Sequence, residues 1–484
     1  MIFSSFEFIF LFLPITFGVY FYLNKKNLIK LATSFLVFSS LFFYSWWNVV
    51  YLPLILFSVV INFLTGKFLL KKISKKISKK MLLILGIIFN LSLLGYFKYS
   101  DFFIQNINVL FNNNYSLLNL TLPLAISFFT FQQIAYLVDN YKGFVDKQSF
   151  TNYFVFVTFF PQLIAGPIVH HKEMMPQFSN IFNKSISYQN IYFGILIFSI
   201  GLFKKVVIAD GFSVWVINGF DVMQELNLIE AWITSLSYTF QLYFDFSGYT
   251  DMALGVAYLF NIKLPINFNS PYKATNIRDF WKRWHITLSR FLRDYVYISL
   301  GGNKKTDFSM YSNLMATFLI GGLWHGAGWT FVFWGSMHGF AIIIHRVWTK
   351  TEKKLNNILA WFLTFNFINL SWIFFRADDW KDAIKVIKGM FGLTNVILPS
   401  FLNEISFLKD KSLVFGDVYK NFNSDAEITL WIFIALISVL IFKNSNQFLT
   451  DYKLNNKMIL FIVFIFTISL LNLEKNIEFI YFNF

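Results

Sequence analysis

Hydrophobic runs long enough to cross a bilayer recur along the whole chain, separated by short polar stretches. A transmembrane helix needs about 20 consecutive, mostly apolar residues. Some runs are long enough to hold two helices or one broken helix, so the pattern predicts an all-α polytopic membrane protein with about eleven to thirteen membrane elements. The runs are residues 3–23, 31–47, 52–70, 81–97, 117–138, 153–169, 192–219, 232–260, 314–347, 359–375, 428–442 and 458–473.

The composition agrees with this pattern. Of the 484 residues, 56% are hydrophobic and 14% are charged, whereas a soluble domain carries about 25% charged residues. We therefore expect a single membrane domain over residues 1–484 rather than several soluble domains. Within it we expect N-terminal helices (1–150), a catalytic core (151–350), and C-terminal helices with an aromatic tail (351–484).

The net charge of +15 is concentrated partly in loops between the predicted spans. Lys25, Lys26 and Lys30 follow the first run, and six lysines lie within residues 71–80. Basic loops of this kind usually lie on the cytoplasmic side and attract membrane lipid, so they do not indicate a nucleic-acid partner. The chain has no Cys, which excludes disulfides, thiolate metal sites and a Cys nucleophile.

Polar and helix-breaking residues enter the apolar runs mainly between residues 161 and 346. Pro161, Gly166 and Pro167 interrupt one run, where we expect either a broken or re-entrant segment or a kinked span. Lys204 and Lys205 interrupt another run. These two lysines either reach the lipid headgroups or bind an anionic group.

Two carboxylates, Asp245 and Asp251, occur in a strongly aromatic stretch. Ionisable groups inside a membrane are costly and need partners. We expect structural ion pairs with nearby Lys or Arg in the first place, and a direct role in catalysis as the alternative.

Residues 263–305 form a basic segment with nine Lys or Arg and two Asp, a net charge of +7. Asn276 is a plausible N-cap, and apolar residues from Ile277 to Tyr295 recur at helical spacing, which predicts one amphipathic helix. Such a helix often lies on the membrane surface. His285, however, falls at the edge of the apolar face among several cations, where it would suit a polyanionic substrate such as coenzyme A.

A second histidine, His325, lies in the stretch Gly321–Trp329, which contains four glycines. These glycines predict a close backbone approach or tight helix packing. An ionisable group in such a core is usually functional, so we expect His325 to act as a general base. His338 and His345 follow in the same apolar run, and we expect a functional role less for them than for His325. His170 and His171 near Glu173 do not favour a metal, so no metal site is expected.

These motifs together resemble the membrane-bound O-acyltransferases (MBOAT proteins), and in particular their bacterial branch of alginate and peptidoglycan O-acetyltransferases and teichoic-acid D-alanyl transfer proteins. The resemblance covers nearly the whole chain. Its most specific parts are the block 267–303, which contains Asp279-Phe280-Trp281-Lys282-Arg283-Trp284-His285, and residues 321–326. The stretches 161–167, 201–210, 243–251 and 333–339 also match.

The resemblance implies a helical membrane bowl with short re-entrant elements. It implies that His325 is the catalytic histidine, that His285 assists it, and that acetyl-coenzyme A is the acyl donor, with no bound cofactor. The expected substrate-binding residues are Lys282, Arg283, Trp284, Arg290, Trp324, Lys204, Lys205, Asp245 and Asp251.

The resemblance also suggests how the acetyl group is passed from this protein to the next acceptor. The chain ends in an aromatic tail in which Tyr481 is a candidate acetyl carrier, although packing explains such a tail equally well. An extracytoplasmic esterase-like transferase would then modify a polysaccharide, with peptidoglycan favoured over alginate, at the bacterial inner membrane. The alternatives are a membrane transporter, which broken helices and buried charges also suit, and an acyltransferase acting on a lipid or a protein.

Overall fold

The computed structural model describes most of the chain, and most of the described residues are helical. They are residues 1–70, 78–145, 149–304, 306–404, 414–419, 422, 427–451, 456–473 and 480. The chain forms two compact units. Unit 1 comprises Met1–Phe203, Ser247–Asn267 and Leu449–Phe484, and unit 2 comprises Lys204–Phe246 and Phe268–Phe448.

Unit 1 is built from apolar helices joined by short turns. Asn62 in α3 and Asn90 in α4 exchange side-chain hydrogen bonds of 3.1 and 2.6 Å, so these two buried amides satisfy each other in an apolar setting. The helices are α1 (Leu13–Lys25), α2 (Ile29–Ser45), α3 (Leu52–Leu70), α4 (Lys79–Leu94), α5 (Ser100–Phe111), α6 (Ile126–Tyr141), α7 (Phe150–Thr158), α8 (Phe160–Leu163), α9 (His171–Ser179), α10 (Tyr188–Phe203) and α22 (Asn456–Leu471).

The run 153–169 is broken, as the prolines predicted. Helix α7 ends at Thr158, the short helix α8 follows, and irregular backbone leads to α9. The backbone carbonyl of Phe156 accepts hydrogen bonds from the side-chain amides of both Gln132 (2.6 Å) and Gln162 (2.7 Å). These buried amides therefore supply partners next to a backbone that no longer continues its own helix.

Unit 2 contains the basic segment and the second histidine. A two-stranded parallel sheet pairs β1 (Ile397–Pro399) with β2 (Val414–Gly416), with Leu398 opposite Phe415. The helix α12 (Leu228–Leu259) belongs to unit 2 up to Phe246 and to unit 1 beyond it. The other helices are α11 (Asp210–Ile217), α13 (Ile277–Arg283), α14 (Ile286–Phe291), α15 (Asp307–His325), α16 (Trp329–Thr349), α17 (Asn357–Arg376), α18 (Trp380–Met390), α20 (Glu427–Ile441) and α21 (Ser445–Asp451).

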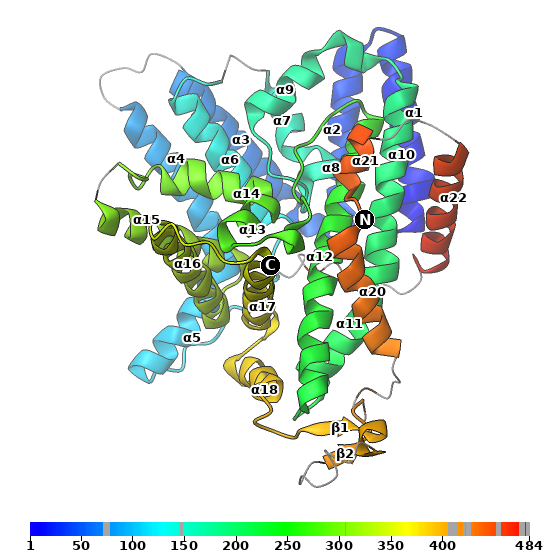
Figure 1. Cartoon of the computed structure of the whole chain (residues 1–484). Coiled ribbons are helices and arrows are strands. Elements are labelled where there is room, and N and C mark those ends of the chain that lie inside the picture. Colours follow the sequence, from blue (N-terminus) through cyan, green and yellow to red (C-terminus); the bar gives the residue numbers. More distant parts are fainter. Residues whose placement is uncertain are drawn as a thin grey trace. The chain divides into compact units, whose positions relative to one another are not determined.

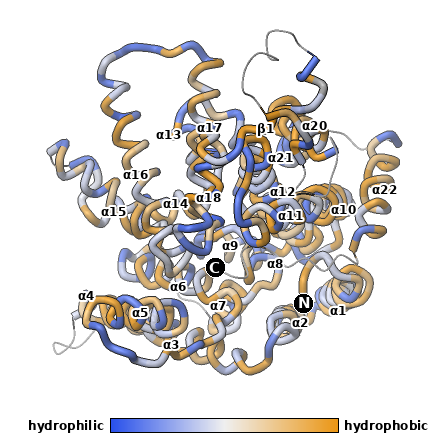
Figure 2. Tube along the Cα trace, turned by 90° about the horizontal axis from the view of Figure 1, so that it is seen from below, coloured by the Kyte–Doolittle hydropathy of each residue, from blue (hydrophilic) through white to orange (hydrophobic). Residues whose placement is uncertain are grey.

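Hydrophobic side chains cover the outside of many helices. Exposed residues on α4 include Leu85 and Ile88, and Figure 2 shows hydrophobic residues along α3, α10 and α22 and a hydrophilic connection between α16 and α17. Among the described residues, five helical segments are long and apolar enough to cross a membrane, and three shorter apolar helices accompany them. The five are Glu7–Lys25, Val49–Leu70, Lys79–Phe111, Tyr188–Val222 and Asn357–Arg376. The predicted all-α polytopic membrane architecture is confirmed.

The long run 314–347 holds two helices, α15 and α16, which lie side by side (Figure 1). They cross at two glycines. A Cβ atom at Gly322 would lie 2.4 Å from the carbonyl oxygen of Phe331, and a Cβ at Gly335 would lie 2.5 Å from that of Phe318. Both distances are shorter than a van der Waals contact, so only glycine permits this approach of the two backbones.

We expect Gly335→Ala to lower the free energy of unfolding by about 1 to 3 kcal/mol, because the added methyl group forces α15 and α16 apart. Thermal unfolding in detergent measures this loss. Gly18→Ala in α1 is the matched control, since no described atom lies within 4 Å of a Cβ built there. Equal stability of the two variants would contradict the proposed role of the crossing.

Candidate active site

The basic segment is not the single amphipathic helix that its spacing predicted. The N-cap is confirmed: the side-chain oxygen of Asn276 accepts a hydrogen bond of 2.8 Å from the backbone N–H of Asp279. However, α13 ends at Arg283, and His285 adopts a left-handed backbone (φ +42°) before α14 begins. A left-handed residue cannot continue a right-handed helix. The prediction of one continuous helix is therefore wrong.

The side chain of Trp284 gives the physical reason for this break. Its ring packs against those of Phe280 and Trp372, at centroid distances of 5.7 and 4.9 Å, and is almost fully buried. The turn that buries Trp284 also buries His285 completely. His285 is thus an interior residue and does not lie at the edge of an exposed apolar face, as the helical spacing suggested.

His285 and His325 lie close together in unit 2. Their ring centroids are 6.5 Å apart, although 40 positions separate them along the chain. His285 also contacts Phe246, with a centroid distance of 4.8 Å, and His325 contacts Trp334 at 5.2 Å and Phe375 at 5.0 Å. Both histidines therefore stand among aromatic rings that restrict their movement and exclude water.

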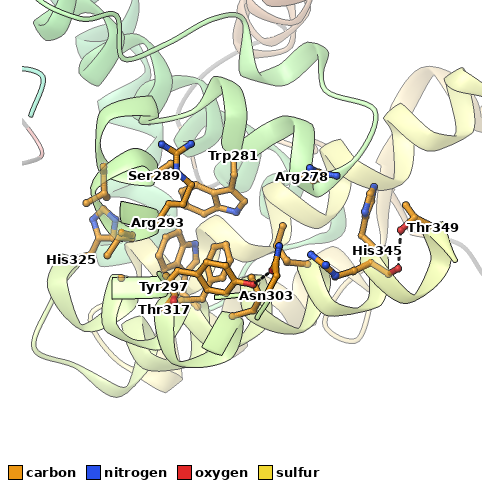
Figure 3. Close-up of a pocket in the computed structure, with 18 of the residues that line it drawn as sticks. Arg278, Trp281, Ser289, Arg293, Tyr297, Asn303, Thr317, His325, His345 and Thr349 are labelled. Carbon is orange, nitrogen blue, oxygen red and sulfur yellow. Dashed lines mark hydrogen bonds between the residues drawn. The ribbon is translucent and has the colours of Figure 1, made fainter. Parts of the chain in front are cut away.

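His325 is the last residue of α15 and lines a pocket of about 620 Å³. Trp281, Ser289 and Trp334 line the same pocket. In Figure 3, His325 lies at one side of the pocket, and His345 and Thr349 lie at the opposite side. The pocket therefore extends from a buried histidine toward the last turn of α16.

Four cationic side chains line this pocket together with His345: Arg278, Arg293, Arg346 and Lys350. Lys350 pairs with Asp307 at 2.5 Å, which joins the end of α16 to the start of α15. Sequence reasoning did not single out these four cations. The sequence did contain a signal for one of them, Arg293. Ser289 and Arg293 follow His285 by four and eight positions, a spacing typical of one helix face.

The residues expected to bind the substrate lie mostly elsewhere. Of the described residues that line the pocket, none is Lys282, Arg283, Trp284, Arg290 or Trp324. Arg283 instead forms an ion pair of 3.0 Å with Asp279 on its own helix. Trp324 contacts both histidine rings, at 6.1 Å from His285 and 4.8 Å from His325, so it belongs to the surroundings of the pair.

Lys205 is buried between two carboxylates. Its ammonium nitrogen lies 2.6 Å from Asp210 and 3.0 Å from Asp245. This arrangement is the structural ion pairing expected for Asp245, and it explains how these charges are accommodated in an apolar unit. Lys204, which is less buried, precedes Lys205 in the same helical turn, and Asp251 belongs to unit 1, where it is buried beside Gly201.

Two further predictions concern the acetyl carrier and a metal site. Tyr481 lies outside the described residues, so its role as an acetyl carrier stays a prediction. His170 lies 3.8 Å from Asp139 in unit 1. Within the described ranges, no group of three His, Cys, Asp or Glu side chains is arranged to hold a metal ion.

His338, which we expected to matter less than His325, positions one wall of the pocket through Trp281. The indole N–H of Trp281 donates to Nδ1 of His338 at 3.2 Å, and Nε2 of His338 lies 3.1 Å from the hydroxyl oxygen of Ser371. Ser371 donates in turn to the carbonyl of Ile368. Because an indole can only donate, Nδ1 must accept and the ring proton must reside on Nε2. His338 is thus a neutral residue that fixes Trp281.

The class of protein follows from these features together with the comparisons. The chain matches the membrane-bound O-acyltransferase (MBOAT) family over residues 31–375 and belongs to it. It is therefore a multi-pass membrane protein and an acyltransferase, which confirms the resemblance and decides against the transporter alternative.

Several relatives show which members of this family the chain is similar to. The chain is 52% identical to the peptidoglycan O-acetyltransferase of Helicobacter pylori, over 84% of this chain and 82% of the relative. It is 38% identical to the probable alginate O-acetylase AlgI of Pseudomonas aeruginosa, over 81% and 75% of the two chains. It is also 29% identical to the teichoic acid D-alanyltransferase of Bacillus subtilis, over 54% and 70%.

We expect His338→Phe to lower the free energy of unfolding by about 1 to 3 kcal/mol, because the half-buried Trp281 N–H loses its acceptor. His345→Phe, on the same helix and less buried, should cost much less. In the Trp281→Phe background, His338→Phe should cost less than in the wild type, since the donor is already gone. Thermal unfolding of the four variants measures this coupling, and strictly additive losses would contradict it.

Proposed function

We propose that this protein transfers an acetyl group from acetyl-coenzyme A, bound from the cytoplasmic side of a bacterial inner membrane, toward O-acetylation of peptidoglycan. The observation that carries this proposal is the pocket that joins His325 to four cationic side chains. Coenzyme A has a polyanionic end and a thioester end, joined by a slender chain. A pocket with cations at one side and a histidine at the other matches this distribution of chemistry.

The cations provide binding for the phosphate groups. Arg278 and Arg346 carry planar guanidinium groups, which suit the binding of phosphate oxygens in pairs. Arg293 and Lys350 add charge to the same pocket, although each already forms an ion pair, with Asp294 at 2.7 Å and with Asp307 at 2.5 Å. Binding at this side directs the thioester toward His325. Hydrophobic residues such as Leu292 and Leu314 also line the pocket and suit the uncharged linker of the donor.

His325 is the proposed general base. It takes the proton of an attacking hydroxyl group as the hydroxyl oxygen forms a bond to the thioester carbonyl carbon. The carbonyl π electrons move to its oxygen, and when they return, the carbon–sulfur bond breaks. The departing thiolate takes the proton from His325, so coenzyme A leaves as the thiol. His285, 6.5 Å away between ring centroids, assists by holding the local geometry.

The acceptor is proposed from the relatives. The peptidoglycan O-acetyltransferase of Helicobacter pylori is 52% identical over four-fifths of both chains, whereas the alginate O-acetylase is 38% identical. Peptidoglycan lies outside the inner membrane, so the acetyl group must cross it. We propose that Tyr481 carries the group and that an extracytoplasmic esterase-like transferase completes the modification.

We expect His325→Ala to reduce coenzyme A release from acetyl-coenzyme A by at least about a thousandfold, because the attacking hydroxyl loses its base. Purified protein in nanodiscs with a muropeptide acceptor and the partner transferase provides the assay. His345→Ala, at the other side of the same pocket, should change KM more than kcat. Turnover retained by a folded His325→Ala variant would refute this role for His325.

We expect Arg346→Gln to raise KM for acetyl-coenzyme A by about tenfold with little change in kcat, since a charge-assisted contact contributes about 1.5 to 3 kcal/mol. Arg283→Gln is the matched control, because Arg283 pairs with Asp279 outside the pocket. A truncated donor, S-acetyl pantetheine, lacks the phosphates and should not distinguish Arg346→Gln from the wild type. A similar loss with both donors would show that Arg346 does not bind phosphate.

We expect wild-type protein incubated with radiolabelled acetyl-coenzyme A to retain label on Tyr481, and Tyr481→Phe to retain none. A phenyl ester is reactive enough to pass its acyl group to a second nucleophile. Peptide mapping of the labelled protein locates the ester. Full acetyl transfer to glycan by Tyr481→Phe would exclude the covalent relay while leaving the role of His325 intact.

A further inference from the structure

Two residues that line the pocket with His325 each carry a buried hydrogen-bond donor. The indole nitrogen of Trp334 and the hydroxyl oxygen of Ser289 are both inaccessible to solvent, and neither has a hydrogen-bond partner within the described part of the chain. Trp334 as a whole is 2% exposed. A buried donor that lacks a partner costs about 1 to 3 kcal/mol, so its retention at a pocket wall calls for an explanation.

The reaction itself requires such donors. When the hydroxyl group attacks the thioester, the carbonyl oxygen gains a full negative charge, and donors already aimed at that oxygen lower the barrier. An indole N–H is suited to this position because it donates and cannot accept. It therefore cannot compete with His325 for the proton of the attacking hydroxyl.

The surroundings of Trp334 hold its ring in place before any substrate binds. The ring is stacked on Trp372 at 5.8 Å with an interplanar angle of 17°, and its centroid lies 4.7 Å from that of His338. The next residue, Gly335, forms the close crossing of α15 and α16. His325 and Trp334 thus stand on two helices whose separation is fixed, with their rings perpendicular and 5.2 Å apart.

Ser289 approaches the pocket from a third helix. The backbone N–H of Ser289 donates to the carbonyl oxygen of His285 at 3.0 Å, so Ser289 lies in the first turn of α14, directly after the left-handed residue. Ser289 and His325 both line the pocket (Figure 3). Trp334 is a further lining residue. Donors from α14 and α16 therefore meet the base from α15 at one pocket.

We propose that the indole N–H of Trp334, aided by the hydroxyl group of Ser289, binds the thioester carbonyl oxygen and stabilises the oxyanion. This inference rests on the proposed acetyl transfer. As the acceptor oxygen bonds to the carbonyl carbon, His325 takes the acceptor proton and the carbonyl π pair becomes the oxyanion held by Trp334. The pair then re-forms the carbonyl, the carbon–sulfur bond breaks, and the thiolate takes the proton from His325. Trp334 and Ser289 neither gain nor lose a proton.

The test removes the indole N–H with little change of shape. Replacing Trp334 with 3-benzothienylalanine puts sulfur in place of the N–H, and Trp334→Phe is the simpler variant. We expect kcat for coenzyme A release to fall about 10²- to 10³-fold in both, while the affinity for acetyl-coenzyme A, measured by calorimetry, changes less than about threefold. Ser289→Ala should lower kcat about tenfold.

Trp348→Phe is the matched control, since it removes the same volume from the same helix, and Trp348 is 41% exposed and is not among the described residues that line the pocket. It should retain kcat within about threefold. An equal fall of kcat in Trp348→Phe, or wild-type kcat in the benzothienyl variant, would overturn the inference. The proposed function fails separately, if wild-type protein releases no coenzyme A or if His325→Ala releases it at the wild-type rate.

Discussion

The close crossing of α15 and α16 is the contact on which the geometry of unit 2 depends. Gly322 and Gly335 allow two backbones to meet without intervening side chains. In a membrane, where lipid and side chains are equally apolar, such close packing supplies much of the attraction between helices. It also fixes His325 at the end of one helix relative to Trp334 near the start of the next. The crossing is therefore needed both for the packing of unit 2 and for the alignment of His325 with Trp334.

The second constraint is the break between α13 and α14. The left-handed backbone of His285 turns the chain inward, so that Trp284 enters the aromatic core and His285 approaches His325. A strained backbone residue persists only where the surroundings determine its conformation. Here the buried ring of Trp284 does so. The two histidines meet because the basic segment is not a continuous helix.

The sequence predicted the class of fold well, because the length of apolar runs is a direct consequence of bilayer thickness. The break at Pro161 and the glycine-dependent packing around His325 were also predictable, since proline and glycine act locally. The cations of the pocket were not. Arg278 and Arg293 come from the basic segment, and Arg346 and Lys350 come from the end of α16. Periodicity within one segment cannot show which long side chains of two segments converge. The periodicity also missed the turn at His285, which tertiary packing imposes.

The hydrogen-bond chain through His338 has a consequence for proton movement. Both ring nitrogens of His338 form hydrogen bonds. Nδ1 accepts from the indole N–H of Trp281, and Nε2 donates to the hydroxyl oxygen of Ser371. Taking up a second proton would break the bond to Trp281 and loosen the pocket wall. His338 is therefore a poor acceptor for the proton held at His325, although it contacts the ring of Trp334 beside the reacting centre.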